Sequence, residues 1–382
     1  MRFRSYTGSW DKIKLNNVCK INPKTPDLKN EFYYIDLESV IKGELIYKNR
    51  IFKTEAPSRA QRVLSYNDIC FQCVRPYQLN NYHFKIKDDN QWVASTGYAQ
   101  LRPYRCNPSF IYQLINSKQF NNEVLLRCTG SSYPAINSND LGEIEISICD
   151  TEEQIKISKF LTLIDKRIAT QNKIIEDLII KKKIISDKLF SQIPTHRNNL
   201  SFYYVKGKAG GTPKSTNKKF YDGEIPFLSI SDMTEQGKYI YRTEKTLTQE
   251  GLNNSTAWIV PKDSLLLSMY ASVGQVAINR IPLTTSQAIF SMTITDKTIL
   301  DYLYYYLSYF KENKLHRYLE TGTQSNINAD FVKGIEIPDY GYCKNKLIVS
   351  LLFLMDEKIK KEKDILSLYK KQKAYLLQNM FI

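Results

Sequence analysis

The chain has 382 residues, of which 42% are hydrophobic and 12% aromatic, which is enough to bury two or three cores and excludes a disordered protein. Its 54 Lys and Arg residues against 39 Asp and Glu give a net charge of +15, which indicates a polyanionic partner, although an AT-rich genome also encodes a Lys-rich chain. Seven scattered cysteines, no apolar run of about eighteen residues and no signal-peptide core exclude a disulfide framework and a membrane span, and predict a cytoplasmic protein.

Residues 1–150 form the first predicted globular domain. Short strands are expected over residues 33–40, 69–74 and 95–101, and a helix over residues 110–126. Short strands accompanied by so few helices indicate an α+β fold.

Loop residues of this domain are candidate DNA contacts. Arg59 and Arg62 have the charge to bind phosphates, and Arg75 and Gln78 are of the types that read guanine or adenine through paired hydrogen bonds. The full set is Arg59, Arg62, Arg75, Tyr77, Gln78, Thr96 and Tyr98. Each residue taken alone is equally typical of a solvated surface, so the prediction depends on the set.

Residues 151–193 are expected to form a long helix. Apolar residues recur at alternating steps of three and four, which is the seam of a coiled coil, and charged residues occupy the other faces. The seam is Ile157, Leu161, Ile164, Ile168, Gln171, Ile175, Leu178, Lys182, Ile185 and Leu189. The alternative is a helix that covers only its own domain, but a seam of about five heptads is longer than that role needs.

Residues 194–341 form the second globular domain, on the same plan as the first. Strands are expected over residues 225–233, 264–269 and 284–295, and a tyrosine-rich helix over residues 300–319. Lysines suited to phosphates and polar side chains near the buried strands make up its candidate DNA contacts. The set is Lys214, Lys218, Lys219, Tyr270, Ser272, Gln275, Thr285 and Gln287.

Residues 342–382 repeat the first long helix. Adding 191 to each seam position gives Ile348, Leu352, Met355, Ile359, Glu362, Leu366, Tyr369, Lys373, Leu376 and Met380. The same offset aligns Ile144 with Ile335 and Phe190 with Phe381. The chain is therefore an internal duplication of two α+β domains, each followed by a long helix, and we expect the two helices to form an antiparallel coiled coil.

The polar seam positions predict the register of this coiled coil. Buried polar residues on a seam fix the register when they find each other. An antiparallel arrangement that places Gln171 opposite Lys373 and Lys182 opposite Glu362 makes the other six pairs apolar on both sides, from Ile164 with Met380 to Leu189 with Met355. About 26 facing residues at roughly 1.5 Å each would make a rod of about 39 Å, close to the ~34 Å turn of B-DNA.

Catalytic and metal-binding motifs do not stand out in the sequence. It has no Asn/Asp-Pro-Pro-aromatic tetrapeptide, no dinucleotide-binding glycine pattern and no helicase motif set. The nearest approach to a nuclease carboxylate cluster is Asp356, Glu357 and Lys358, which lie on a long helix, where a solvated face is the simpler interpretation. Cys70 and Cys73 have the spacing of a zinc or redox pair, but without a second pair we expect them to pack as small hydrophobic residues.

Several motifs resemble those of the specificity subunits of type I restriction-modification systems, and the likeness in element order covers the whole chain. The opening of a target recognition domain is similar at Gly210, Gly211, Thr212, Pro213, residues 221–226 and residues 229–232. Its close is similar at Gly322, Thr323, Gln324, residues 326–328 and residues 335–338, and the start of the helix at Gln154, Phe160 and residues 161–168. The first half departs from this pattern, because residues 22–26 contain no double glycine.

The resemblance implies that residues 1–150 and 194–341 are target recognition domains, each reading one half of a split double-stranded DNA sequence. Residues 151–193 and 342–382 are then conserved spacer helices that set the spacing and dock methyltransferase subunits, with a restriction/translocase subunit joining the complex. The resemblance implies a non-catalytic chain that holds no cofactor, with S-adenosylmethionine, ATP and Mg on the partner subunits.

Two other functions remain open at the level of sequence. One is a DNA endonuclease or methyltransferase with degenerate motifs, which activity of the isolated chain would reveal. The other is a scaffold or decoy that keeps the helices but binds DNA weakly, without regard to sequence and in a salt-sensitive manner.

Overall fold

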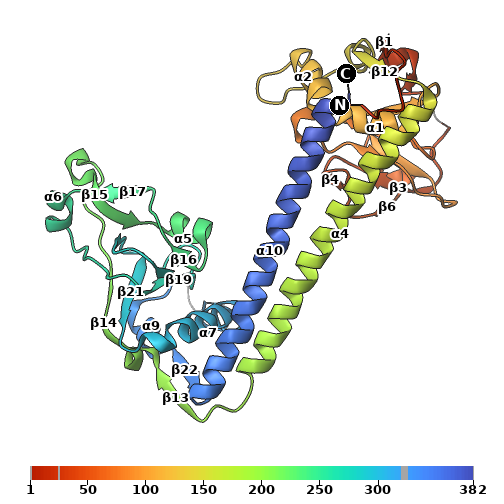
Figure 1. Cartoon of the computed structure of the whole chain (residues 1–382). Coiled ribbons are helices and arrows are strands. Elements are labelled where there is room, and N and C mark those ends of the chain that lie inside the picture. Colours follow the sequence, from red (N-terminus) through yellow and green to blue (C-terminus); the bar gives the residue numbers. More distant parts are fainter. Residues whose placement is uncertain (1, 25, 320–325, 382) are drawn as a thin grey trace. The chain divides into compact units, whose positions relative to one another are not determined.

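The computed structural model describes residues 2–24, 26–319 and 326–381 (Figure 1). The motif residues Gly322, Thr323 and Gln324 therefore lie outside the described part of the chain. The chain divides into two compact units, of which unit 1 is Met1–Ile174 with Glu362–Ile382 and unit 2 is Ile175–Lys361.

Unit 1 contains two four-stranded sheets. The antiparallel sheet has the order β2 (Cys19–Ile21), β11 (Tyr98–Pro103), β8 (Ile69–Gln72) and β9 (Tyr82–His83). The mixed sheet has the order β6 (Asn49–Phe52), β3 (Glu31–Ile35), β10 (Trp92–Ser95) and β7 (Ala60–Val63), with β10 parallel to β3. Two further pairs are β1 (Asp11–Lys14) with β12 (Glu145–Ile148) and β4 (Val40–Ile41) with β5 (Glu44–Leu45).

The helix expected over residues 110–126 is in fact two helices, α1 (Pro108–Ile115) and α2 (Lys118–Leu126). The break occurs because the Ser117 hydroxyl accepts a hydrogen bond from the Phe120 amide and so caps a new helix. A short α3 (Ser138–Gly142) follows. Cys70 and Cys73 are buried free cysteines, as expected for packing residues, and burial raises the pKa of the Cys73 thiol to about 12.

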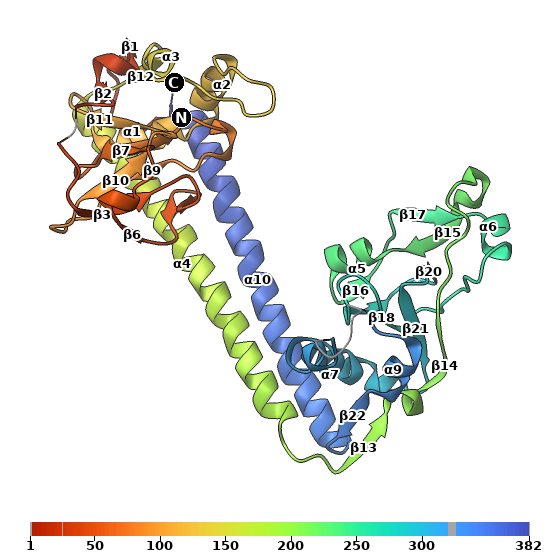
Figure 2. The same ribbon diagram turned by 180° about the vertical axis from the view of Figure 1, so that it is seen from behind.

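Unit 2 repeats this arrangement (Figure 2). Its five-stranded sheet has the order β14 (Tyr204–Ala209), β21 (Ile289–Ile294), β18 (Leu265–Ser268), β19 (Val276–Asn279) and β16 (Tyr239–Ile240). The three-stranded sheet is β17 (Lys245–Leu247), β15 (Tyr221–Leu228) and β20 (Thr284–Thr285), with β20 parallel to β15, and β13 (His196–Asn199) pairs with β22 (Glu336–Asp339). Its short helices are α5 (Ile230–Gln236), α6 (Gln249–Asn253), α7 (Leu300–Asn313), α8 (His316–Leu319) and α9 (Ala329–Gly334).

The shared topology confirms that the duplication is a duplication of fold. In unit 1, β2 pairs with β11, which pairs in turn with the fully buried β8. In unit 2, β14 pairs with β21, which pairs in turn with the fully buried β18. Each unit also has a parallel strand pair in its second sheet, β3 with β10 and β15 with β20, and unit 2 has a further parallel pair, β16 with β19. The strand expected over residues 284–295 is interrupted between β20 and β21, in the same way that a turn separates β10 from β11.

The two long helices are α4 (Thr151–Phe190) and α10 (Tyr342–Met380), and they pair antiparallel within each unit, as expected (Figures 1 and 2). In unit 1, Leu161 of α4 shares a core with Leu376 of α10. In unit 2, Leu189 of α4 shares a core with Leu352 of α10. All sixteen residues expected at the helix contact, from Ile164 to Leu189 and from Met355 to Met380, are buried or half-buried.

The predicted register is wrong. The expected pairs Gln171 with Lys373 and Lys182 with Glu362 are replaced by other partners. The Gln171 side-chain amide donates to the Glu362 carboxylate at 2.5 Å. Lys373 pairs with Asp165 at 2.6 Å and Lys182 pairs with Asp356 at 2.5 Å. Both aspartates lie beside the seam. The two lysines reach them because a long lysine side chain can keep its methylene groups in the apolar contact and place its ammonium group at the flank of the helix pair.

Candidate nucleic-acid interface

Three segments of unit 1 converge next to β8 and β10. The Cys73 amide, just after β8, donates to the Gly97 carbonyl at 3.0 Å. The Thr96 amide, in the turn between β10 and β11, donates to the Arg59 carbonyl at 2.9 Å. These bonds place the backbone of Arg59 and Thr96 beside the start of the loop that carries Arg75.

A buried glutamine shapes the loop after β8. Gln72 is only 2% exposed, and its side-chain amide donates to the Val74 carbonyl and to the Gln78 side-chain oxygen, each at 2.8 Å. Its own side-chain oxygen accepts from the Asn80 amide at 3.1 Å. The loop is thus preformed, with Tyr77 and Gln78 exposed on its outer side.

The double glycine of unit 2 is required by close packing. The Gly210 amide donates to the Ile289 carbonyl at 3.1 Å and the Gly211 amide to the Thr285 carbonyl at 2.9 Å. A Cβ on Gly210 would lie 2.0 Å from the Thr285 carbonyl oxygen, and one on Gly211 would lie 2.2 Å from the Thr256 hydroxyl. Only glycine lets this segment approach β20 so closely.

The loop after β18 joins the double-glycine segment of unit 2. The Met269 amide donates to the Ala288 carbonyl at 2.7 Å, and the Thr212 hydroxyl hydrogen-bonds the Gln287 side chain. The Ser268 hydroxyl donates to the Ser272 carbonyl at 2.7 Å and so holds the turn. Tyr270, Ser272 and Gln287 are exposed around this junction.

The lysines predicted for unit 2 follow the double glycine in sequence. Lys214, Lys218 and Lys219 are exposed. The segment is anchored because Tyr221 donates to the Pro213 carbonyl at 2.7 Å and the Thr248 hydroxyl donates to the Lys219 carbonyl at 2.8 Å. Charge is therefore presented from a fixed backbone, as phosphate binding requires.

Two predicted DNA contacts are excluded by burial. Tyr98 and Thr285 are both fully buried. The Tyr98 hydroxyl donates to the Asp36 carbonyl at 3.2 Å, and the Thr285 hydroxyl hydrogen-bonds the Ser291 hydroxyl at the same distance. Tyr98 opens β11 and Thr285 ends β20, and the neighbouring strand positions are buried as well, so neither side chain reaches the surface of the loops.

Two further candidates are only partly available. Arg62 is half-buried on β7, and burial lowers the pKa of its guanidinium. The Gln275 side-chain oxygen accepts from Lys311 at 2.6 Å, so this side chain supports the turn of unit 2. Burial also lowers the pKa of Lys311.

One exposed residue beside the unit 1 loops was missed by the sequence analysis. Tyr133 lies on the turn before α3, and the Arg75 guanidinium carbon is 4.4 Å from the centre of its ring. The local sequence Ser-Ser-Tyr-Pro reads as an ordinary turn, and Arg75 is distant in sequence, so no local signal identifies the contact.

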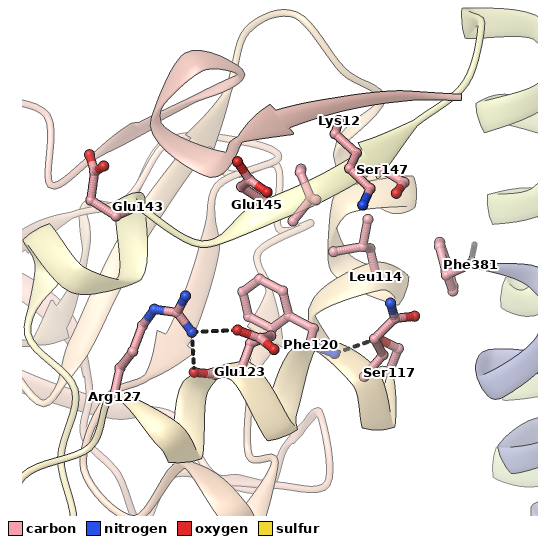
Figure 3. A pocket seen from close by; sticks show the side chains of 12 residues that line it. Lys12, Leu114, Ser117, Phe120, Glu123, Arg127, Glu143, Glu145, Ser147 and Phe381 are labelled. Carbon is pink, nitrogen blue, oxygen red and sulfur yellow. Dashed lines mark hydrogen bonds and ion pairs between the residues drawn. The ribbon is translucent and has the colours of Figure 1, made fainter. Parts of the chain in front are cut away.

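One pocket of unit 1 is lined by elements other than these loops (Figure 3). Its volume is about 410 Å³, and Lys12, Glu145, Phe120 and Phe381 line it. Arg127 lies at its rim and pairs with Glu123 of the same helix at 2.5 Å, so opposite charges offset each other there.

No described group of three or more His, Cys, Asp or Glu side chains is placed to hold a metal ion. Within the same residues, no helix combines the length and apolarity that crossing a bilayer needs.

Comparison with known proteins gives matches over most of the chain. The family model described as "Type I restriction modification DNA specificity domain" matches residues 8–179 and 202–368. The type I restriction enzyme HindI specificity subunit of Haemophilus influenzae is 22% identical over 419 aligned residues, covering 87% of each chain. The MjaIX specificity subunit of Methanocaldococcus jannaschii is 30% identical over 179 residues, which cover 45% of this chain and 40% of that protein.

Two solved structures share the fold. A chain from a study of complex assembly and conformational transition of the type I R-M system aligns over 97% of both chains, with a TM-score of 0.65 and 19% identity. The type I restriction-modification S subunit from M. genitalium aligns over 100% of this chain and 99% of its own, with a TM-score of 0.58 and 17% identity. At these identities the two structures establish the fold.

Proposed function

The chain belongs to the family of type I restriction-modification specificity subunits, and on that premise we propose that each unit reads one half of a split double-stranded DNA sequence. One observation carries this proposal, namely that the two units share a topology but differ at the loops beside their buried strands. Unit 1 presents Arg59 and Arg75 there, whereas unit 2 presents Tyr270 and Gln287. One scaffold with different polar side chains suits the recognition of two different half-sites.

In this proposal α4 and α10 act as the spacer between residues 1–150 and residues 194–341. Their antiparallel pairing within each unit supports this role. The Asp165–Lys373 and Lys182–Asp356 pairs support it further, because they resist sliding of one helix along the other.

Partner docking is the second role we assign to the helices. Several large apolar side chains remain exposed on them, which a helix that faces only water does not need. They include Leu163, Ile180 and Ile184 on α4 and Leu347, Leu354 and Leu368 on α10. We assign this surface to methyltransferase subunits, with a restriction/translocase subunit joining them, and S-adenosylmethionine, ATP and Mg belong to those partners. The chain itself recognises DNA and carries out no chemistry.

The test is methylome sequencing of cells that lack other adenine methylation and express this chain with its methyltransferase subunits. A single modified motif made of two half-sites separated by a fixed spacer is expected. Absence of any motif, in cells where the complex assembles, would contradict the proposal. Cleavage or methylation by the isolated chain would favour the enzyme alternative instead, and binding indifferent to sequence would favour the decoy.

A further inference from the structure

We propose that Arg75 reads a guanine in the half-site of unit 1 and that Tyr133 holds the Arg75 guanidinium in its reading position. This inference depends on the function proposed above, since it names the base and the side chain for one of the two half-sites. The argument uses the backbone of Arg75, the stacking contact and the unused hydrogen-bond donors.

The backbone of Arg75 is fixed by its neighbours. Arg75 lies in the left-handed region, with a φ of 53°, which a residue with a Cβ rarely adopts. Its amide donates to the Pro134 carbonyl at 2.8 Å, and its carbonyl accepts from the Gln78 amide at 3.1 Å. The side chain therefore leaves the loop from a defined point and in a defined direction.

The Tyr133 turn is tied to the same loop. Thr129 and Ala135 exchange backbone hydrogen bonds of 2.9 Å, which close the turn that carries Tyr133. The Ile136 amide then donates to the Cys73 carbonyl at 3.1 Å. The ring is 64% exposed, Arg75 is half-buried, and the Arg75 guanidinium carbon lies 4.4 Å from the ring centre, so the contact lies at the surface.

The Tyr133 ring lies against the Arg75 guanidinium, and no described protein group accepts a hydrogen bond from the guanidinium N–H groups. The N–H groups lie in the guanidinium plane and point outward from it. Within the described part of the chain, no carboxylate forms an ion pair with Arg75. Arg50 is the contrasting case, since it lies 6.0 Å from the Tyr33 ring but pairs with Glu31 at 2.7 Å.

A planar fork of two free donors matches guanine. In the major groove guanine presents two acceptors side by side, O6 and N7, whereas adenine presents a donor at N6 beside its N7 acceptor. An oriented guanidinium can therefore separate the two bases by direct hydrogen bonding. A phosphate oxygen also accepts from arginine, and the experiment below separates the two targets.

The experiment is methylome sequencing of the complete complex with variants at Arg75 and Tyr133, on the DNA of the expression host. Arg75→Ala should relax one guanine position in one half-site by about tenfold or more, with the spacer and the other half-site unchanged. Arg75→Lys should relax the same position, because an ammonium has no planar fork. Tyr133→Phe should retain the motif, whereas Tyr133→Ala should relax the same guanine in part.

Arg50→Ala is the matched control, and its motif should equal that of the parent chain. A uniform loss of methylation at all sites in Arg75→Ala, with no base relaxed, would identify a phosphate contact and overturn the proposal. An unchanged motif in Arg75→Lys would overturn it too, because charge alone would then suffice. A parent complex without a two-part motif would instead refute the proposed function itself.

Discussion

The side-chain amide of Gln171 donates to the carboxylate of Glu362, and these two residues are 191 positions apart, which is the repeat length of the chain. The same offset relates the two ion pairs to each other, because Asp165 corresponds to Asp356 and Lys182 to Lys373. The polar contacts of the helices thus follow the duplication. Gln171 contacts the residue at its own corresponding position, and each ion pair has the other as its corresponding pair.

The Gln171–Glu362 contact should show strong energetic coupling. Glu362→Leu removes the carboxylate acceptor of the buried Gln171 amide, which also donates to the Glu362 backbone carbonyl at 3.1 Å. We expect the loss to cost about 1–3 kcal/mol, and Gln171→Leu/Glu362→Leu should recover part of it. A double-mutant cycle on the free energy of unfolding measures the coupling, expected to exceed about 1 kcal/mol. Glu176→Leu, at an exposed position of α4, is the control and should change stability by less than about 0.5 kcal/mol. Strictly additive single changes would show that the contact is unimportant.

Charge reversal tests the ion pair between Lys182 and Asp356. Lys182→Glu places two carboxylates together and should destabilise the chain by about 1 kcal/mol or less, since both side chains are about one-third exposed. Lys182→Glu/Asp356→Lys should restore stability. The difference between the single and the double variant should shrink as salt is added in urea unfolding experiments. A difference that is insensitive to salt would point to packing instead of charge.

The double glycine should tolerate no side chain. Gly210→Ala would place a Cβ 2.0 Å from the Thr285 carbonyl oxygen, and we expect it to destabilise the protein by about 1–3 kcal/mol, as overpacking does. Gly334→Ala is the control, because nothing lies within 4 Å of its Cβ position. Thermal unfolding of both variants measures the effect, and equal melting temperatures would contradict the close approach.

His83 should make the free energy of unfolding depend on pH in the acidic range. Burial lowers its pKa to about 3, against about 6.5 in an unfolded chain, so the unfolded state binds the extra proton between these values. Its contribution to stability is therefore complete above about pH 6.5 and falls by about 1.4 kcal/mol per pH unit as the pH drops toward 3. His83→Leu should make the slope of unfolding free energy against pH shallower by this amount. An unchanged slope in His83→Leu would contradict the prediction.

The duplication and the helix seam could be predicted because both depend on apolar periodicity, which burial enforces. Leu161 and Leu352 are buried at the expected positions since a heptad seam leaves them no other environment. The register could not be predicted from the same pattern. Lys182 and Lys373 lie on the seam in sequence but carry their charges to aspartates beside it.

The candidate interface was predictable at the level of loops and not of individual side chains. The segments after β8 and β18 follow from strands with no polar face, and Tyr77 and Tyr270 are exposed there. The inward direction of Tyr98 and Thr285 depends on the exact residue at which a strand begins or ends, which a short sequence pattern does not define. The contact of Tyr133 with Arg75 depends on tertiary hydrogen bonds that join two turns.

A change in helix length tests the central claim most directly. Duplicating one heptad in each helix, residues 168–174 and the corresponding residues 359–365, preserves the seam and adds about 10.5 Å to each helix, or about three base pairs. Methylome sequencing of the complex should then return the same two half-sites with a spacer longer by about three base pairs. Altered half-site bases with an unchanged spacer would contradict an account in which the units read the sequence and the helices set its spacing.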